Sequence, residues 1–315
     1  MGTLFTFIYD GIRTDFGYPA RLMRLIQERP ELAINVPEPA QNINASSVVR
    51  WDHFGQAALE DWPRRRPSQL RGWRTSGGYF ESFALERLEF DQLCQRSVQS
   101  NWQCDITTVD GFSASKSDLK AFRTMDEMVE MNSPELINAI TPEKLAENLA
   151  HDEIRIIHSD SNTDYFARFA WDGRLFLMNS GGSHHFAAAK HIATRLNRAV
   201  TLSGELQTYS LNEMAIASLL RDFEMFVIAD EPEIHNEFYE AMRHFEATWL
   251  WAQMPYPYVD GCRAILLPRS EARSMRVAKA LREAGVLDLG NHLVGICARQ
   301  RQVPGLTKEL VWQSH

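Results

Sequence analysis

The sequence predicts an α/β (α+β) protein in which a mixed sheet with helices lies between N- and C-terminal extensions. From residue 131 onward, segments with helical spacing alternate with short apolar segments typical of strands. A glycine-rich turn joins one such strand to one such helix near the middle of the chain. With 315 residues, 44% hydrophobic and 23% charged, the chain can bury one large core or two smaller ones.

Residues 1–130 form an N-terminal region whose fold we leave unassigned, because prolines interrupt it repeatedly. We expect helices at 18–28 and 81–99. Basic and aromatic residues alternate between Trp62 and Arg74, a pattern that allows contact with a nucleic-acid backbone. We favour a solvated loop there. The basic residues of this patch are Arg64, Arg65, Arg66, Arg71 and Arg74.

The middle region, residues 131–212, carries the clearest element signals. Thr141-Pro142-Glu143 predicts a helix start, with Thr as N-cap and Pro at the first helical position, and this helix runs to about residue 150. Residues 154–158 and 166–171 are predicted strands, separated by a polar turn. Residues 171–174 predict a hairpin turn that leads into a strand at 175–179.

The C-terminal region, residues 213–315, is predicted to be helical with a small βαβ unit. Apolar residues at steps of three and four predict one long amphipathic helix over 231–252. A strand at 264–267, a helix at 270–284 ended by Gly285 and a strand at 293–298 would form the βαβ unit.

The segment from Asn179 to His185 is the strongest candidate for a binding site. Gly181 and Gly182 allow positive φ and let backbone N–H groups approach a ligand. The first N–H groups of a helix lack internal partners and favour an anion. A tight turn without ligand is the alternative. The His184–His185 pair favours the anion, because a protonated histidine at a helix N-terminus is unfavourable without one.

The motif Ser-Gly-Gly-Ser-His-His is similar to the Gly-Gly-Cys-His-Arg signature of sulfiredoxin and, more loosely, to the Gly-Glu-Arg-Arg motif of the ParB N-terminal domain, which share one fold. The resemblance extends over about 131–211 through the helix opening at 140–149, the strands within 166–179 and a return strand at 200–206. It implies a ParB/sulfiredoxin-like domain that binds the phosphates of ATP or another nucleotide, with Mg²⁺.

The resemblance also implies roles for particular residues. The phosphate-binding residues would be Ser180, Gly181, Gly182, Ser183, His184 and His185. His184 and His185 would also be catalytic, with carboxylates from the segment that the family places beside its nucleotide. We assign Glu143 and Glu147 to that role, while Asp152 and Glu153 are further candidates and which of the four faces inward stays open.

Two departures from the family pattern change what is expected. Ser183 stands where sulfiredoxin has its nucleophilic cysteine, so we do not expect sulfiredoxin activity. His185 stands where the family has an arginine, which predicts weaker and pH-sensitive phosphate binding.

The sequence therefore predicts a nucleotide- or phosphate-binding protein, with nucleotide hydrolysis or phosphotransfer as its expected chemistry. One alternative is a catalytically inactive binding or regulatory protein that recognises a protein partner through its terminal regions. The other is a nuclease, which the net charge of −8 disfavours because the chain repels a polyanion.

No metal site, membrane span or disulfide framework is predicted. The four cysteines contain no Cys-x-x-Cys pair, which favours reduced thiols in a cytoplasmic protein. Ser113-Ala-Ser-Lys116 has the spacing of a penicillin-binding motif, but its companion motifs are absent. Histidines that a fold could gather around a metal lack the spacing of a hydrolase helix. They are His151, His158, His184, His185 and His191.

Overall fold

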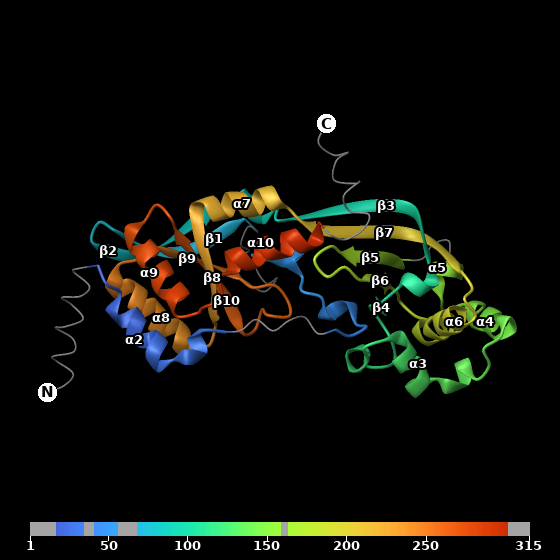
Figure 1. Ribbon diagram of the computed structural model, residues 1–315. Coiled ribbons are helices and arrows are strands. Elements are labelled where there is room, and N and C mark those ends of the chain that lie inside the picture. The colour runs from blue at the N-terminus through green and yellow to red at the C-terminus, as the bar shows by residue number, and fades with distance from the viewer. Residues whose placement is uncertain (1–16, 35–40, 56–67, 159–162, 302–315) are drawn as a thin grey trace. The chain divides into compact units, whose positions relative to one another are not determined.

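The structure is a computed structural model that describes residues 17–34, 41–55, 68–158 and 163–301. The chain divides into two compact units (Figure 1). The first unit comprises the described residues within 1–37, 50–94 and 211–298, and the second those within 38–49, 95–210 and 299–315. Each unit contains a five-stranded sheet accompanied by helices, so the predicted α/β class is confirmed.

The second unit holds the predicted mixed sheet, with strand order β3-β7-β5-β6-β4. Strand β5 pairs parallel with β7 and antiparallel with β6, and β4 pairs parallel with β6. The predicted hairpin turn joins β5 to β6 through Gly173, which has positive φ. The strands are β3 (Cys94–Asp105), β4 (Gly111–Phe112), β5 (Tyr165–Phe169), β6 (Leu175–Met178) and β7 (Thr201–Leu211).

Helix α6 (Ser183–Arg195) forms the centre of this unit's core. Its buried face contributes Phe186, Ile192 and a run of alanines at 187–189, which share a core with Phe166 and Leu177 of the sheet. Helix α6 packs against α3 (Met125–Asn132) and α4 (Pro142–Leu149). The shorter helices of the unit are η2 (Ala45–Ser47), η5 (Ile106–Thr108), η6 (Leu119–Ala121), η7 (Pro134–Ile137) and α5 (Arg155–His158).

The first unit is built on an antiparallel sheet with strand order β2-β1-β9-β10-β8. Helix α2 packs against α8 and α9, and these helices share a core with β8 and β10. The strands are β1 (Gln69–Ser76), β2 (Tyr79–Glu86), β8 (Phe223–Ala229), β9 (Trp249–Gln253) and β10 (Cys262–Pro268). The helices are α2 (Ala20–Glu28), η1 (Pro30–Leu32), η3 (Trp51–His53), η4 (Leu88–Phe90), α7 (Glu213–Asp222), α8 (Pro232–Phe245), α9 (Ala272–Glu283) and α10 (Leu289–Gln300).

Two predicted elements of residues 81–158 are wrong. The helix at 81–99 is replaced by parts of β2 and β3. Gly77 and Gly78, both with positive φ, form the two-residue turn of a β1–β2 hairpin, which the helix prediction overlooked. The strand at 154–158 is one turn of helix, α5. There Ile154 and Ile156 are buried while Arg155 and Ile157 are exposed, and this alternation imitates a strand.

Two predictions for the C-terminal region are also wrong. The long helix ends at Phe245 instead of residue 252, because Glu246 adopts a left-handed conformation and the chain continues into β9. The strand at 293–298 lies within α10, so no βαβ unit forms. Leu289, Leu293 and Ile296 are buried at helical spacing in that short apolar segment.

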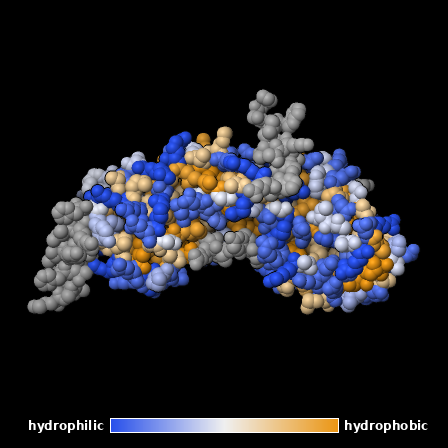
Figure 2. Space-filling view, in the orientation of Figure 1, coloured by the Kyte–Doolittle hydropathy of each residue, from blue (hydrophilic) through white to orange (hydrophobic). Residues whose placement is uncertain are grey.

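The surface mixes hydrophilic and hydrophobic residues. On the face shown in Figure 2, hydrophilic residues surround several smaller hydrophobic areas, which is ordinary for a folded domain. Among the described residues, no helix is long and apolar enough to cross a membrane. All four cysteines are free thiols.

Candidate functional site

The predicted glycine turn exists, and it begins helix α6. Gly182 is the N-cap residue, with φ of 70° and ψ of 11°. A Cβ added at this residue would lie 2.6 Å from the backbone oxygen of Glu153, so only glycine fits without a shift of the backbone. The backbone N–H of Phe186 donates to the Gly182 oxygen (2.9 Å). The N–H groups of residues 183–185 come before this first helical hydrogen bond. Like those at the start of any helix, they have no acceptor within the helix.

Side-chain hydrogen bonds hold the turn in place. The buried Asn179 amide donates from Nδ2 to the backbone oxygens of Ala114 and Gly181, each at 2.9 Å. Its Oδ1 accepts from the Ala114 N–H at 3.2 Å. Ser180 donates from its backbone N and from Oγ to Asp164 Oδ1, at 3.0 and 2.6 Å. These contacts fix the turn against segments distant in sequence.

A pocket of about 540 Å³ opens at this turn, and we call it the glycine-turn pocket. All six residues predicted to bind phosphate line it, so the fold brings them together at one cavity. Three other segments complete the wall. The lining residues are Ala114, Ser115, Lys116, Ser133, Glu135, Leu136, His151, Glu153, Arg155, Ser180, Gly181, Gly182, Ser183, His184 and His185.

Two cationic side chains of the pocket were not predicted as site residues. Arg155 donates from Nη1 to Ser180 Oγ at 2.5 Å, next to the glycine turn. Lys116 is an exposed residue; after burial, its charge is the next largest cause that lowers the pKa of His184. In the sequence, Lys116 belongs to a motif typical of penicillin-binding enzymes, which indicates no phosphate site. Arg155 lies in the segment that was wrongly predicted as a strand. Only the tertiary fold places both cations beside the turn.

The two predicted histidines are held by neutral hydrogen-bonding groups. His184 has Ser133 Oγ 2.5 Å from Nδ1 and Ser117 Oγ 3.0 Å from Nε2. His185 Nδ1 lies 3.1 Å from Asn148 Oδ1. Burial lowers the pKa of both histidines below the ordinary value of 6.5. Both imidazoles are therefore mainly neutral at neutral pH and can accept a proton when an anion binds beside them.

His151 adds a third imidazole to the wall of the pocket. Its ring stacks on that of His185, with 3.7 Å between the ring centroids. Its Nδ1 is buried and makes no hydrogen bond within the described part of the chain, while Asp152 Oδ1 lies 3.9 Å away. A buried polar atom without a hydrogen bond marks a place where a ligand or water could supply one.

The carboxylates assigned from the family resemblance lie outside the lining of this pocket. Glu143 and Glu147 are both exposed on α4, and Glu147 accepts a hydrogen bond from Lys144 Nζ at 2.8 Å. The carboxylates that line the pocket are Glu135 and Glu153. Glu153 is one of the four carboxylates that the sequence indicates, whereas the sequence does not indicate Glu135. Its segment carries no motif that would have marked it.

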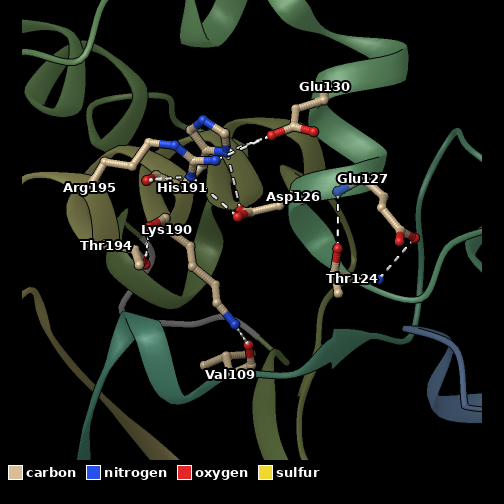
Figure 3. Close-up of polar contacts among 9 residues, drawn as sticks. All are labelled: Val109, Thr124, Asp126, Glu127, Glu130, Lys190, His191, Thr194 and Arg195. Carbon is tan, nitrogen blue, oxygen red and sulfur yellow. Dashed lines mark hydrogen bonds and ion pairs between the residues drawn. The ribbon is translucent and has the colours of Figure 1, made fainter.

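A second polar cluster joins α3 to α6 (Figure 3). His191 Nδ1 faces Asp126 Oδ1 at 3.2 Å and Glu130 Oε1 at 3.8 Å, and these three side chains could offer atoms to a metal within 4.8 Å of one another. Arg195 pairs with both carboxylates, at 3.2 Å each. Because this guanidinium already supplies positive charge there, we interpret the cluster as an ion-pair network between helices.

The basic patch proposed for nucleic acid is described only in part. Arg64, Arg65 and Arg66 lie outside the described residues. Arg74 donates to Glu81 and lies 5.0 Å from the ring centroid of Phe83, while Arg71 is exposed on β1. Arg74 is thus engaged within its own hairpin.

A protein-family model described as "Family of unknown function (DUF6685)" matches residues 99–305, which include every residue lining the glycine-turn pocket. Neither a curated protein nor a solved structure matches the chain.

Proposed function

We propose that this chain, which belongs to the DUF6685 family, binds the phosphate groups of a nucleotide in the glycine-turn pocket. One observation carries the proposal. The N-terminus of α6, formed by a turn that admits only glycine at residue 182, lies in the same cavity as Lys116 and Arg155. Helix N–H groups and a guanidinium are the groups that proteins use for phosphate oxygens.

The size and the remaining polar groups of the pocket support a nucleotide as ligand. A volume of about 540 Å³ is within the range of small-molecule sites. The negative charges of Glu135 and Glu153 balance the positive charges of Lys116 and Arg155 in the lining. Carboxylate oxygens suit Mg²⁺, so these two residues are the ones that would hold the metal of a nucleotide complex.

We also propose a ParB/sulfiredoxin-like fold for the region around the pocket. The motif at the turn supports it, and the segments expected from that resemblance form α4, β5, β6 and β7. Sulfiredoxin chemistry is not part of the proposal. Ser183 donates from Oγ to Ser115 Oγ at 2.9 Å, and a hydroxyl cannot replace the redox-active thiolate.

Isothermal titration calorimetry with ATP, CTP, GTP and pyrophosphate, each with and without Mg²⁺, tests the proposal. We expect saturable binding by at least one of them, weakened about tenfold or more in Arg155→Gln because a charge-assisted hydrogen bond is lost. Arg198→Gln is the matched control, since Arg198 is exposed in the same unit and outside the pocket. No binding at millimolar concentration, or equal affinity in Arg155→Gln, would overturn the proposal.

A turnover assay on the nucleotide that binds distinguishes an enzyme from a binding protein. His185 bonds to Asn148 through Nδ1, so its Nε2 remains available for proton transfer, which supports nucleotide hydrolysis or phosphotransfer as the reaction. Release of inorganic phosphate that His185→Gln abolishes would identify a hydrolase. Binding without release would identify the inactive binding protein instead, and cleavage of plasmid DNA would identify a nuclease.

A further inference from the structure

A second pocket, of about 720 Å³, lies in the same unit and shares no residue with the glycine-turn pocket. Four cationic side chains line it: Lys120, Arg123, Arg174 and Lys190. Asp110 is the carboxylate among its lining residues. We call it the Lys190 pocket. Such a concentration of positive charge is notable in a chain whose net charge is −8.

Lys190 is the most unusual member of this group. It projects from the middle of α6, between the fully buried Ala189 and the buried His191. Figure 3 shows its side chain reaching the Val109 carbonyl, away from the His191 cluster. In the described part of the chain this is its one hydrogen bond, and it forms no ion pair. Burial lowers its pKa, although Asp110 and Asp126 oppose that effect.

The ammonium of Lys190 therefore has unused hydrogen-bonding capacity. An ammonium group has three N–H donors, and one carbonyl satisfies one of them. A partly buried charge is costly, and because neither Asp110 nor Asp126 forms an ion pair with Lys190, a bound anion would stabilise it further. Water can satisfy the same donors, but water carries no compensating charge.

The other cations of the pocket differ in how they are held. Arg174 donates to both carboxylate oxygens of Asp172, at 2.6 and 2.7 Å, and to the Asn42 carbonyl at 2.6 Å, which fixes it as part of the wall. Lys120 and Arg123 are exposed, and neither forms an ion pair with any described residue. Counting Asp110 and Asp172, cations outnumber carboxylates at this pocket.

We propose that the Lys190 pocket binds a small oxyanion with at least two negative charges, such as a phosphoryl compound. Lys190 would contact the anion from the interior of the protein, while Lys120 and Arg123 would contact it from the surface. The proposal does not rest on the function proposed for the glycine-turn pocket, because the two cavities have separate lining residues.

Lysine NMR can test the two pockets separately. The chain has six lysines, at positions 116, 120, 144, 190, 279 and 308. In protein labelled with ¹³C at the lysine ε carbon, Lys120 and Lys190 report on this pocket and Lys116 reports on the glycine-turn pocket. Lys279, in the other unit, is the internal control. Conservative Lys→Arg variants at the five other positions assign Lys190 by elimination.

Pyrophosphate is titrated at constant ionic strength, so that general screening does not change. We expect the Lys120 and Lys190 signals to shift with one common saturable midpoint, while Lys279 stays unchanged. Arg123→Gln should raise that midpoint about tenfold or more, as expected when a charged hydrogen bond is lost. Arg198→Gln, an equal change of charge outside the pocket, should leave it unaltered.

A parallel titration with malonate shows whether the pocket prefers a phosphoryl anion or a dicarboxylate. Saturation by pyrophosphate at much lower concentration indicates a phosphoryl ligand, and the reverse indicates a dicarboxylate. Lys190 and Lys120 signals that do not saturate with either anion would overturn the proposal, as would an unchanged midpoint in Arg123→Gln. A response of Lys116 alone would support the glycine-turn pocket and overturn this second site.

Discussion

Gly181 and Gly182 are adjacent, but the space available for a side chain differs between them. Gly182 has positive φ, and a Cβ there would lie 2.6 Å from a backbone oxygen. At Gly181 the corresponding distance is 3.5 Å, an ordinary contact. We expect Gly182→Ala to lower the free energy of unfolding by roughly 1–3 kcal/mol, the usual cost of a strained backbone position. Gly181→Ala should change it far less, and urea unfolding of both variants measures the difference.

Substitutions at Gly181 and Gly182 also distinguish an effect on protein stability from an effect on ligand binding. A methyl group at residue 181 fits the protein but narrows the space where N–H groups would meet a phosphate. We therefore expect Gly181→Ala to fold normally and to bind nucleotide more weakly. Equal stability of the two variants would contradict the role given to Gly182.

His184 and His185 predict how nucleotide affinity depends on pH. Burial lowers the pKa of both, Lys116 lowers that of His184 further, and His151 that of His185, while Glu135 and Glu153 act in the opposite direction. A bound phosphate favours the charged imidazole and raises its pKa in the complex. Affinity should therefore rise as pH falls and be lost as pH rises through the pKa of the complex.

Calorimetry between about pH 5.5 and 8, which brackets the ordinary histidine pKa, checks this expectation. The double variant His184→Gln/His185→Gln is the control, because it retains hydrogen-bonding groups and corrects for titration of the ligand itself. The same pH profile in both proteins would show that neither histidine meets the phosphate.

At the scale of elements, Asn148 joins α4 to its neighbours. This residue is 1% exposed, and its Nδ2 donates to the carbonyls of Leu136 (2.9 Å) and Lys144 (3.0 Å). Its Oδ1 lies 3.1 Å from His185 Nδ1 on α6. We expect Asn148→Ala to lower the free energy of unfolding by about 1–3 kcal/mol, because buried partners lose their hydrogen bonds. Thermal and urea unfolding measure this, with exposed Glu147→Ala on the same helix as the control.

The elements that the sequence predicted well have local signals. Thr141 caps α4 through a hydrogen bond from the Lys144 N–H, as its side chain predicts. Gly173 and Gly182 mark the turns that precede β6 and α6. The elements that were predicted wrongly have apolar spacings that fit both a helix and a strand. Ile154 and Ile156, for example, are both buried two residues apart, as in a strand, yet the segment folds as the helix α5.

The candidate site divides in the same way. Residues 180–185 are contiguous and carry their signal in one motif, so the sequence could indicate them. Lys116, Ser133 and Arg155 come from separate segments that meet only in the folded unit. No spacing in the sequence places them together. Of the four carboxylates that the family resemblance offers, Glu153 therefore lines the pocket, whereas Glu143 and Glu147 do not.

Over the chain as a whole, histidines that are buried or half-buried predict sensitivity to acid. Burial is the largest cause that lowers the pKa of His184, His185, His191 and His235. The unfolded chain then binds more protons than the native protein below the ordinary pKa of about 6.5. The free energy of unfolding should be highest above about pH 7, where the unfolded histidines are also neutral, and fall as pH decreases below that value.

Urea unfolding followed by tryptophan fluorescence from about pH 8 to 5 tests this, across the histidine range. The double variant His184→Gln/His185→Gln should lose less stability over that interval. A second loss is expected in stronger acid, because Arg87 lowers the pKa of Glu89 from 4.5 to about 2. Constant stability between pH 8 and 5 would contradict the burial of neutral histidines.

We propose above all that the N-terminus of α6 holds a phosphate. A crystal structure with the tightest-binding nucleotide tests it most directly. We expect phosphate oxygens within hydrogen-bonding distance of the backbone N–H groups at residues 183–185 and of the Arg155 guanidinium. A nucleotide bound with its phosphates elsewhere, or a saturated crystal whose glycine-turn pocket contains only water, would contradict it.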